Sequence, residues 1–230
     1  MQQRRRQVMA ATVELEQVTF CGVRILAAPG VVMVPQRATE ALVALAIECI
    51  GSRAARVADV GTGTGAVAVA VALRSPRARV WATDDSEAAV ELARMNVAGH
   101  GLENRVDVML GDLLEPVPGR LDLVLANLPY HAEARSHAAG ENARGPQPVH
   151  ALYVSGDGLQ LNRDLIDACR VRLDERGTLI LQLYGSMLSA EKDKLDLLLR
   201  EVEVRAREGW QVRVAAAAAG RSRTWKPWHP

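Results

Sequence analysis

Apolar and polar positions change their period at several points along the chain, and these changes divide it into short elements. Two stretches with strand character, 16-EQVTF-20 and 23-VRILA-27, flank Cys21-Gly22, which predicts a β-hairpin. A third extended stretch, 31-VVMVP-35, follows it. Between residues 39 and 50 apolar side chains recur at helical spacing and a glycine then provides a stop, so we expect a helix there.

From residue 51 onward the pattern becomes an alternation of strands, loops and helices. This alternation predicts an α/β fold, with a mostly parallel sheet and helices on both of its faces. Ligands of such sheets bind outside the carboxyl ends of the strands, so polar residues at those ends are the first candidates for a site. The predicted strands are 56-RVADV-60, 79-RVWAT-83, 105-RVDVML-110, 121-LDLVLA-126 and 178-TLILQL-183, and the predicted helices lie near 65–74, 86–98 and 158–173.

The last third of the chain is less regular. Residues 131–150 have no sustained period, and we interpret them as a loop or a substrate lid. Residues 189–209 suit a charged surface helix, whereas 210–215 and 222–225 suit a final antiparallel pair of strands. We see no repeat and expect a single globular domain.

Composition narrows the class of protein. With 230 residues, 49% of them hydrophobic, the chain can bury one sizeable core. Its longest apolar runs are far shorter than the ~18 residues of a membrane span, and Glu14 and Glu16 interrupt the segment where a signal peptide needs continuous apolar residues. Three widely spaced cysteines indicate neither a disulfide framework nor a zinc pattern. These features favour a cytoplasmic protein with no membrane association.

Charge says little about partners. The net charge is +1, and arginine dominates the 28 basic residues in a chain that is also rich in alanine. Such a bias is typical of a genomic composition, so the arginines are weak evidence for a nucleic-acid partner. Three histidines at 131, 137 and 150 lack the spacing and partner carboxylates of a metal site, so we expect no metal.

A glycine-rich loop, 59-DVGTGTGAVAVA-70, follows the first main strand and opens a helix. Glycines at such a place let the backbone turn tightly and approach a ligand. Gly61, Gly63 and Ala66 also satisfy the dinucleotide fingerprint, so a nicotinamide oxidoreductase stays open. Asp59 favours the other interpretation, because an acid there suits a cofactor with an amino group and a sulfonium and would repel a pyrophosphate.

Acidic residues follow the next two strands. Asp84 ends the second strand, where a carboxylate can accept hydrogen bonds from both hydroxyls of a ribose. Asp85 or Ser86 is the better candidate for capping the following helix. Asp112 follows the third strand and can accept from an adenine amino group, although a turn-capping role fits nearly as well. Together these residues outline a nucleoside site.

The fourth strand ends in 127-NLPY-130. The Asn127 side-chain oxygen and the Leu128 carbonyl can accept both N–H groups of a planar amide or amine nitrogen and hold it for methyl transfer. Pro129 stiffens the turn, and Tyr130 offers a flat ring for a planar acceptor. An ordinary strand end with an Asn-Pro turn is the structural alternative. The position of the tetrapeptide downstream of the glycine loop favours the functional interpretation.

These motifs together resemble the class I S-adenosylmethionine methyltransferases, and within them the HemK (PrmC) protein-glutamine N5-methyltransferases, which carry Asn-Pro-Pro-Tyr at this place. Similarity extends to 20-FCGVRILAAPGVVMVPQRATE-40, 147-QPVHAL-152, 157-DGLQLNRDLI-166 and 220-GRSR-223. The resemblance implies a Rossmann-like methyltransferase fold, whose seven-stranded, mostly parallel sheet has an antiparallel last strand. It divides the chain into 1–50, with the extension, hairpin and leading helix, and a methyltransferase domain over 51–230.

The chain also departs from the family. Only about 17 residues precede the hairpin, so we expect no counterpart of the family's N-terminal helical domain in them. In 35-PQRATE-40 only Pro35, Thr39 and Glu40 of the family's pattern remain, and Leu128 replaces the first proline of the tetrapeptide. These departures leave methyl transfer intact but open the question of its acceptor.

The expected function is N-methylation of a planar amide or amine, with a protein glutamine favoured. RNA adenine, a small metabolite, a nicotinamide-dependent oxidation and a non-catalytic binding scaffold are the alternatives. We assign to the cofactor Asp59, Gly61, Thr62, Gly63, Gly65, Asp84, Asp85, Asp112, Leu113 and Asn127, and to catalysis Asn127, Leu128, Pro129 and Tyr130.

Overall fold

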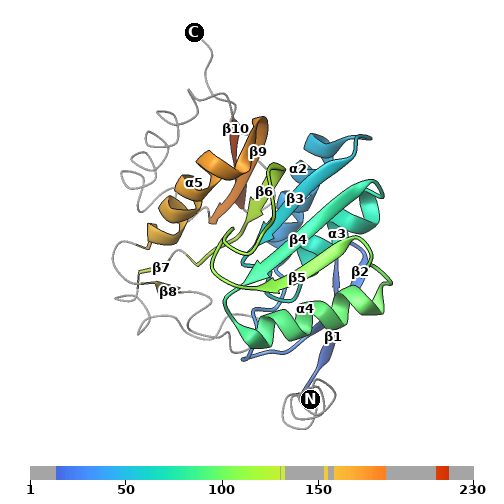
Figure 1. Cartoon of the computed structure of the whole chain (residues 1–230). Coiled ribbons are helices and arrows are strands. Elements are labelled where there is room, and N and C mark those ends of the chain that lie inside the picture. The colour runs from blue at the N-terminus through green and yellow to red at the C-terminus, as the bar shows by residue number, and fades with distance from the viewer. Residues whose placement is uncertain (1–13, 130, 133–152, 155–157, 185–210, 218–230) are drawn as a thin grey trace.

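A parallel sheet with helices on both faces forms the body of the protein (Figure 1). The computed structural model describes residues 14–129, 131–132, 153–154, 158–184 and 211–217. Within these residues the main sheet has six strands in the order β10-β9-β6-β3-β4-β5, and every neighbouring pair runs parallel. The strands are β3 (Ala55–Val60), β4 (Ala78–Asp84), β5 (Val106–Leu110), β6 (Leu121–Ala126), β9 (Leu173–Tyr184) and β10 (Gln211–Ala217).

The two faces of this sheet carry separate parts of the core. One face packs against α2 (Glu40–Ile50), α3 (Ala66–Arg74) and the end of α4 (Glu87–Gly99), and the other packs against α5 (Gln160–Arg172). The sequence AVAVAVA of α3 is buried throughout, because this helix lies between the sheet and its neighbouring helices. Small alternating alanine and valine side chains allow such close packing on all sides of a helix.

The N-terminal hairpin of β1 (Glu16–Phe20) and β2 (Val23–Ala27) is held against the sheet by polar side chains. Asn96 of α4 accepts from the Leu26 amide at 2.7 Å and donates to the carbonyls of Leu26 and Thr64 at 2.9 and 2.8 Å. Glu40 accepts from the Cys21 amide at 3.0 Å. Buried polar groups that are fully paired fix one arrangement of their neighbours, so the hairpin has a defined position beside the glycine loop.

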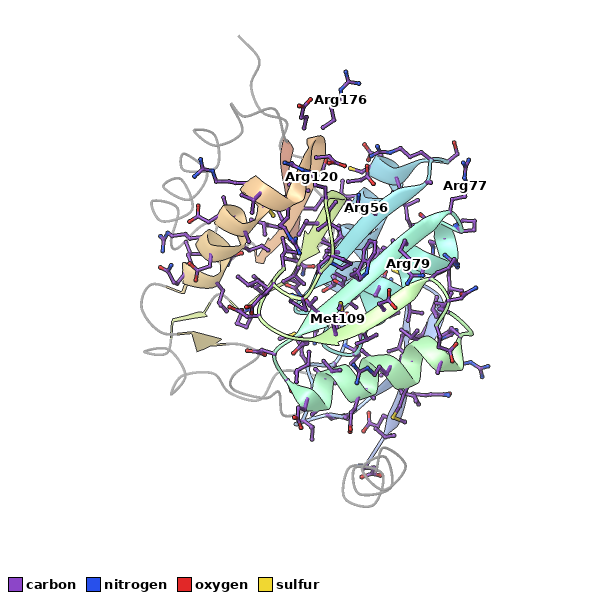
Figure 2. All side chains as sticks on the ribbon, viewed as in Figure 1. Arg56, Arg77, Arg79, Met109, Arg120 and Arg176 are labelled. Atoms are coloured by element: carbon purple, nitrogen blue, oxygen red, sulfur yellow. The ribbon has the colours of Figure 1, made fainter. Side chains whose placement is uncertain are left out.

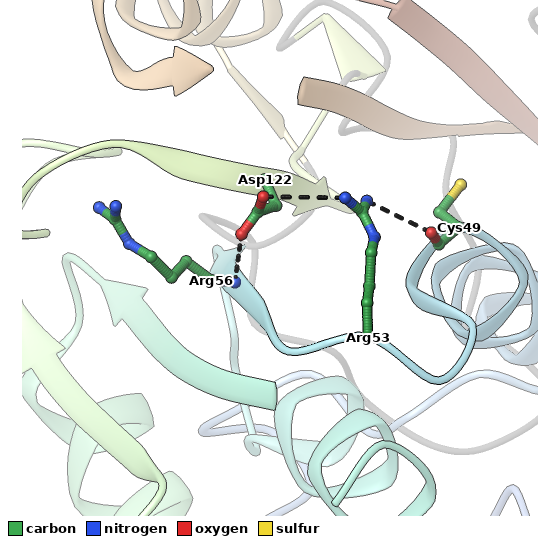
Figure 3. Close-up of polar contacts among 4 residues, drawn as sticks. All are labelled: Cys49, Arg53, Arg56 and Asp122. Atoms are coloured by element: carbon green, nitrogen blue, oxygen red, sulfur yellow. Dashed lines mark hydrogen bonds and ion pairs between the residues drawn. The ribbon is translucent and has the colours of Figure 1, made fainter. Parts of the chain in front are cut away.

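Asp122 joins three elements at the amino ends of the strands, the edge of the sheet opposite the glycine loop (Figure 3). Its carboxylate accepts from the Arg56 amide at 2.7 Å and lies 3.9 Å from the Arg53 guanidinium. Arg53 in turn donates to the Cys49 carbonyl at the end of α2 at 3.4 Å. The exposed ion pair contributes only about 0–1 kcal/mol, so the bond to the backbone amide is the stronger reason for an acid here.

The predicted strands and helices of the main sheet are confirmed, with boundaries within a few residues. The hairpin is confirmed as well, whereas 31–35 forms a turn and an irregular stretch instead of a strand. A 3-10 turn, η1 (Arg37–Thr39), precedes α2. A short parallel pair, β7 (His131–Ala132) with β8 (Tyr153–Val154), lies at the borders of the expected lid, and 133–152 lie outside the described residues.

The last described strand is β10, which covers the predicted strand 210–215 and pairs in parallel with β9. Its predicted antiparallel pairing with 222–225 stays a prediction. Residues 189–209 and 222–225 lie outside the part of the chain that the structure describes. The six described strands thus accord with a mostly parallel α/β sheet. In the same described part, no helix combines the length and the apolar character that crossing a membrane requires.

Candidate active site

The carboxyl ends of four neighbouring strands open into one cavity of about 220 Å³. Gly61 follows β3, Asp84 ends β4, Asp112 follows β5 and Asn127 follows β6, and all four line this cavity. Parallel strands bring these positions together although up to 66 residues separate them, counted from Gly61 to Asn127. The sequence prediction that the motifs share one edge of the sheet therefore agrees with the geometry.

The glycine loop crosses the bottom of the cavity in a left-handed backbone conformation. Gly61, Gly63 and Gly65 have φ angles of +69°, +55° and +76°, which side chains other than glycine rarely adopt. The loop is joined to β4 by two bonds: the Thr62 amide donates to the Thr83 carbonyl at 2.9 Å and the Gly63 amide donates to Asp84 at 2.8 Å. Gly61 and Gly63 line the cavity, while Gly65 packs against α4.

Asp59 lies beneath the loop and is 3% exposed. Its Oδ2 atom accepts from the Thr62 hydroxyl at 2.6 Å and from the Ala68 amide at 3.1 Å. Burial raises the pKa of Asp59 from its ordinary value of 3.8 to about 6, although these two hydrogen bonds oppose the shift. The carboxylate thus organises the loop and the start of α3, and its direct contact with a cofactor stays a prediction.

Asp84 lines the cavity, and its two carboxylate oxygens accept hydrogen bonds from different segments of the chain. Oδ2 accepts from Gly63 and Oδ1 accepts from the Ser86 amide at 3.1 Å. Ser86 caps α4 by accepting from the Ala89 amide at 3.4 Å, which leaves the exposed Asp85 to line the cavity. The contact of Asp84 with ribose hydroxyls stays a prediction.

Asp112 and Leu113 form the third wall. Asp112 is exposed, and Leu113 has a left-handed φ of +43°. The Thr83 hydroxyl donates to the Leu113 carbonyl at 2.8 Å, which holds this turn next to the end of β4. A non-glycine residue in this conformation is uncommon, and it directs the Leu113 side chain to the cavity lining.

The fourth wall is the turn after β6. Asn127, Leu128 and Pro129 line the cavity, and Tyr130 lies outside the described residues. Leu128 is 6% exposed, and a Cβ atom built on Gly61 would lie 2.9 Å from its Cδ2 atom. The side-chain Nδ2 atom of Asn127 donates to the Thr39 hydroxyl at 3.5 Å. The cofactor loop and the predicted acceptor turn are therefore in direct contact.

The charges of the cavity are acidic. Its lining contains Asp84, Asp85 and Asp112, and neither lysine nor arginine is among the described lining residues. Figure 2 shows Arg56, Arg77 and Arg120 at the amino ends of the strands, away from this cavity. Such a lining favours a ligand with positive charge and disfavours a pyrophosphate.

Comparison with known families identifies the fold and its relatives. The family model of the methyltransferase small domain matches residues 23–143, more than half of the 230-residue chain. This chain belongs to the methyltransferase small-domain family. The matched residues include β2 of the hairpin, the glycine loop and the tetrapeptide, so the family model covers the loop and the four strand ends described above.

Curated relatives of this methyltransferase small-domain protein are release factor glutamine methyltransferases. The one from Deinococcus radiodurans is 36% identical over 219 residues, which cover 93% of this chain and 74% of the relative. The one from Gloeobacter violaceus is 40% identical over 156 residues, which cover 67% of this chain and 54% of the relative. The resemblance to the HemK family is confirmed, although the chain spans about half the length of several of these relatives.

Solved structures support the fold alone. A methyltransferase from Agrobacterium tumefaciens aligns with a TM-score of 0.58 at 18% identity, covering 92% of this chain and 67% of that one. A 16S rRNA N2 G1207 methyltransferase from T. thermophilus aligns with a TM-score of 0.53 at 19% identity, covering 73% and 41%. Both are methyltransferases, which confirms the predicted Rossmann-like methyltransferase fold.

Sequence reasoning missed several residues of the methyltransferase cavity. Val31, Val32, Met33 and Leu161 contribute apolar lining, and Thr39 contacts Asn127 from behind. The only signal for the first three was a short apolar run before Pro35, which we interpreted as a strand. Leu161 and Thr39 lie in stretches that resemble the family, but no role at the site was predicted for them, because their place there depends on how α5 and α2 pack on the sheet.

Proposed function

We propose that this methyltransferase small-domain protein transfers a methyl group from S-adenosylmethionine to the side-chain amide nitrogen of a protein glutamine. A release factor is the first candidate substrate, because the curated relatives carry that name. The observation that carries the proposal is the placement of Asn127 in one cavity with Gly61, Gly63 and Asp84. The cofactor elements and the acceptor tetrapeptide thereby face the same space.

The lining fits the proposed cofactor. S-adenosylmethionine carries a sulfonium, an ammonium and a ribose, and it supplies a methyl group that a nitrogen lone pair can displace in line. Asp84 offers carboxylate oxygens for the ribose hydroxyls, and Asp85 and Asp112 add negative charge near the positive groups. Gly61 and Gly63 leave room for close approach by the backbone. Apolar Val31, Val32 and Leu113 suit the flat adenine.

Asn127 and Leu128 position the acceptor. A glutamine amide nitrogen is a weak nucleophile because its lone pair is delocalised, so orientation is the main contribution that an enzyme can make. The Asn127 side-chain carbonyl and the Leu128 backbone carbonyl accept the two N–H groups and direct the nitrogen toward the methyl group. The nitrogen then releases one proton, for which water is a sufficient acceptor. This route needs no covalent enzyme intermediate.

Two substitutions separate the proposed roles. We expect Asn127→Ala to lower methyl transfer by roughly 100-fold or more, the range that misplacement of a reacting group can reach, with cofactor affinity within a few-fold of wild type. We expect Asp84→Ala to weaken binding of S-adenosylhomocysteine in calorimetry, because it removes the ribose acceptor and the bond to Gly63. Asp122→Ala is the matched control, since that carboxylate also binds a backbone amide but lies at the opposite edge of the sheet. Loss of cofactor binding in Asn127→Ala would contradict its assignment to the acceptor.

The acceptor is tested with tritiated S-adenosylmethionine. Purified release factor from the host should take up label, and the same protein with its acceptor glutamine replaced should not. Protein, RNA and small-molecule pools of a host lysate are counted in parallel. Label that appears in RNA or in small molecules but not in protein would overturn the glutamine assignment while leaving methyl transfer in place.

A further inference from the structure

The side-chain amide of Asn127 has two ends, and only one of them suits the proposed reaction. Its carbonyl oxygen can accept from the N–H groups of an acceptor amide, whereas its own NH2 group would face them donor to donor. The two ends have nearly the same shape, so packing alone discriminates poorly between the two orientations. A hydrogen-bond partner behind Asn127 is needed to hold the oxygen toward the cavity.

Thr39 supplies that partner in the structure. The Asn127 Nδ2 atom donates to the Thr39 hydroxyl oxygen at 3.5 Å, although 88 residues separate the two in the chain. Thr39 is 6% exposed and its amide donates to the Gln36 carbonyl at 2.9 Å, so its position is fixed by the 3-10 turn. Because Nδ2 is bonded to Thr39, the side-chain oxygen of Asn127 can face the cavity that Asn127 lines.

The helix around Thr39 does not use this hydroxyl as a cap. The 3-10 turn Arg37–Thr39 continues directly into α2, and Thr39 has a helical backbone with φ of −75° and ψ of −11°. A capping residue has an extended backbone, and the Thr39 side chain makes no capping bond to the first turn of α2.

A second acceptor lies on the same face of the sheet. Ala126 of β6 and Leu181 of β9 are the last pair of this register, and Asn127 and Gln182 are the residues that follow each of them. Leu125 and Ile180, two residues earlier in each strand, share one core cluster, so 127 and 182 project toward the same side. Gln182 is 2% exposed, and its Oε1 atom has no hydrogen-bond partner among the described residues.

We propose that Thr39 is a positioning residue, which holds the Asn127 side-chain amide with its carbonyl oxygen toward the methyl acceptor, and that Gln182, which is not bonded to Asn127 in the structure, accepts from the second Asn127 N–H when the methyl acceptor is bound. A buried carbonyl without a partner is unfavourable, and the remaining Nδ2 hydrogen of Asn127 is a donor on the adjacent strand. This inference rests on the proposed function, because it orients the group that binds the acceptor.

The test compares Thr39→Val with Thr39→Ser in methyl transfer to the release factor. Valine keeps the shape of threonine and removes the oxygen, so kcat should fall about tenfold or more, the effect of roughly one hydrogen bond, with KM for the cofactor unchanged. Serine keeps the oxygen and should restore most of kcat. Gln182→Leu should lower kcat in the same direction as Thr39→Val. Thr178→Val is the matched control, a buried threonine at 7% exposure on β9 that does not line the cavity.

A double-mutant cycle separates positioning from a general loss of structure. If Thr39 acts through Asn127, adding Thr39→Val to Asn127→Ala should cause no further loss of kcat. The inference would be wrong if Thr39→Val kept the wild-type kcat, or if the losses of kcat in Thr39→Val and Asn127→Ala added in full. Either result would leave the proposed function in place. Absence of transfer by the wild-type protein to every glutamine substrate would reject the proposed function, and this inference with it.

Discussion

Substitution of Gly61 by alanine tests whether the cofactor loop and the acceptor turn are mechanically linked. A left-handed residue with a Cβ atom is destabilised by about 1–2 kcal/mol, and Gly61 has a φ of +69°. The new Cβ would also lie 2.9 Å from Leu128 Cδ2, well inside the ~3.5–4.0 Å of an ordinary carbon contact. Leu128 is buried and must move by roughly 0.5–1 Å to relieve this contact.

We expect Gly61→Ala to lose more kcat than its loss of stability alone would explain. We expect the buried Leu128 side chain to displace its own backbone carbonyl, the group proposed to orient the acceptor. A shift of about 1 Å in such a group can lower turnover by up to ~100-fold, so we expect kcat to fall roughly 10-fold to 100-fold with saturating cofactor. Gly22→Ala is the matched control, because Gly22 has a φ of +73° and nothing lies within 4 Å of its built Cβ. Urea unfolding and methyl transfer are measured on both variants.

Gly61→Ala should lose somewhat more stability than Gly22→Ala because of the contact with Leu128, and only Gly61→Ala should lose turnover. Adding Leu128→Ala to Gly61→Ala removes the close atom and should recover part of kcat, since the backbone carbonyl is retained. Equal turnover in Gly61→Ala and Gly22→Ala, at saturating cofactor, would refute the argument that the loop acts on the turn through Leu128.

Three further predictions concern the residues around the loop. Burial raises the pKa of Asp59 to about 6, so the folded state holds this proton more tightly than the unfolded state and stability is lost as pH rises from about 4 to 6. Asp59→Asn should remove that pH dependence, which amounts to roughly 3 kcal/mol for a shift of about two pKa units. Urea unfolding of both proteins is followed across pH. If the difference in unfolding free energy between wild type and Asp59→Asn stayed constant from about pH 4 to 6, the raised pKa would be contradicted. Asn96→Leu should destabilise the protein by about 2–4 kcal/mol, since three backbone groups lose a buried partner. Hydrogen exchange around Leu26 and Thr64 should increase in this variant, and unchanged exchange would contradict the role of Asn96 in holding the hairpin. Gly65→Ala should reduce stability more than Gly22→Ala, because its Cβ would lie 3.0 Å from the Cβ atom of Ala93 in addition to the strain of a φ of +76°; equal melting temperatures would show that α4 yields freely.

The elements of the sheet were predictable because their apolar residues form periodic patterns or nearly continuous runs that end at loops. Residues 66–74 and 121–126 are nearly continuous runs, as expected for a helix buried on all sides and a strand buried on both faces. The partner of β10 was not predictable, because an alternating pattern is the same for parallel and antiparallel neighbours.

The site was predictable where a motif lies at a strand end, and less so elsewhere. Asp84 and Asn127 line the cavity because parallel strands deliver them there. The orientation of Asp59 was not contained in its motif: the same spacing allows a carboxylate that faces a ligand or one that accepts from Thr62 and Ala68. Thr39 and Leu161 reach the site only through helix packing, which local sequence does not encode.

The acidic lining of the cavity has a consequence for repeated turnover. The proposed methyl donor carries a sulfonium charge, and the product that remains after transfer has lost it. Carboxylates at Asp84, Asp85 and Asp112 therefore attract the donor more strongly than the spent product. At an effective dielectric constant between those of protein surface and water, one charge several ångströms away is worth about 1 kcal/mol, or roughly a fivefold preference. The same side chains that admit the donor thus limit product inhibition, and added salt should weaken this advantage.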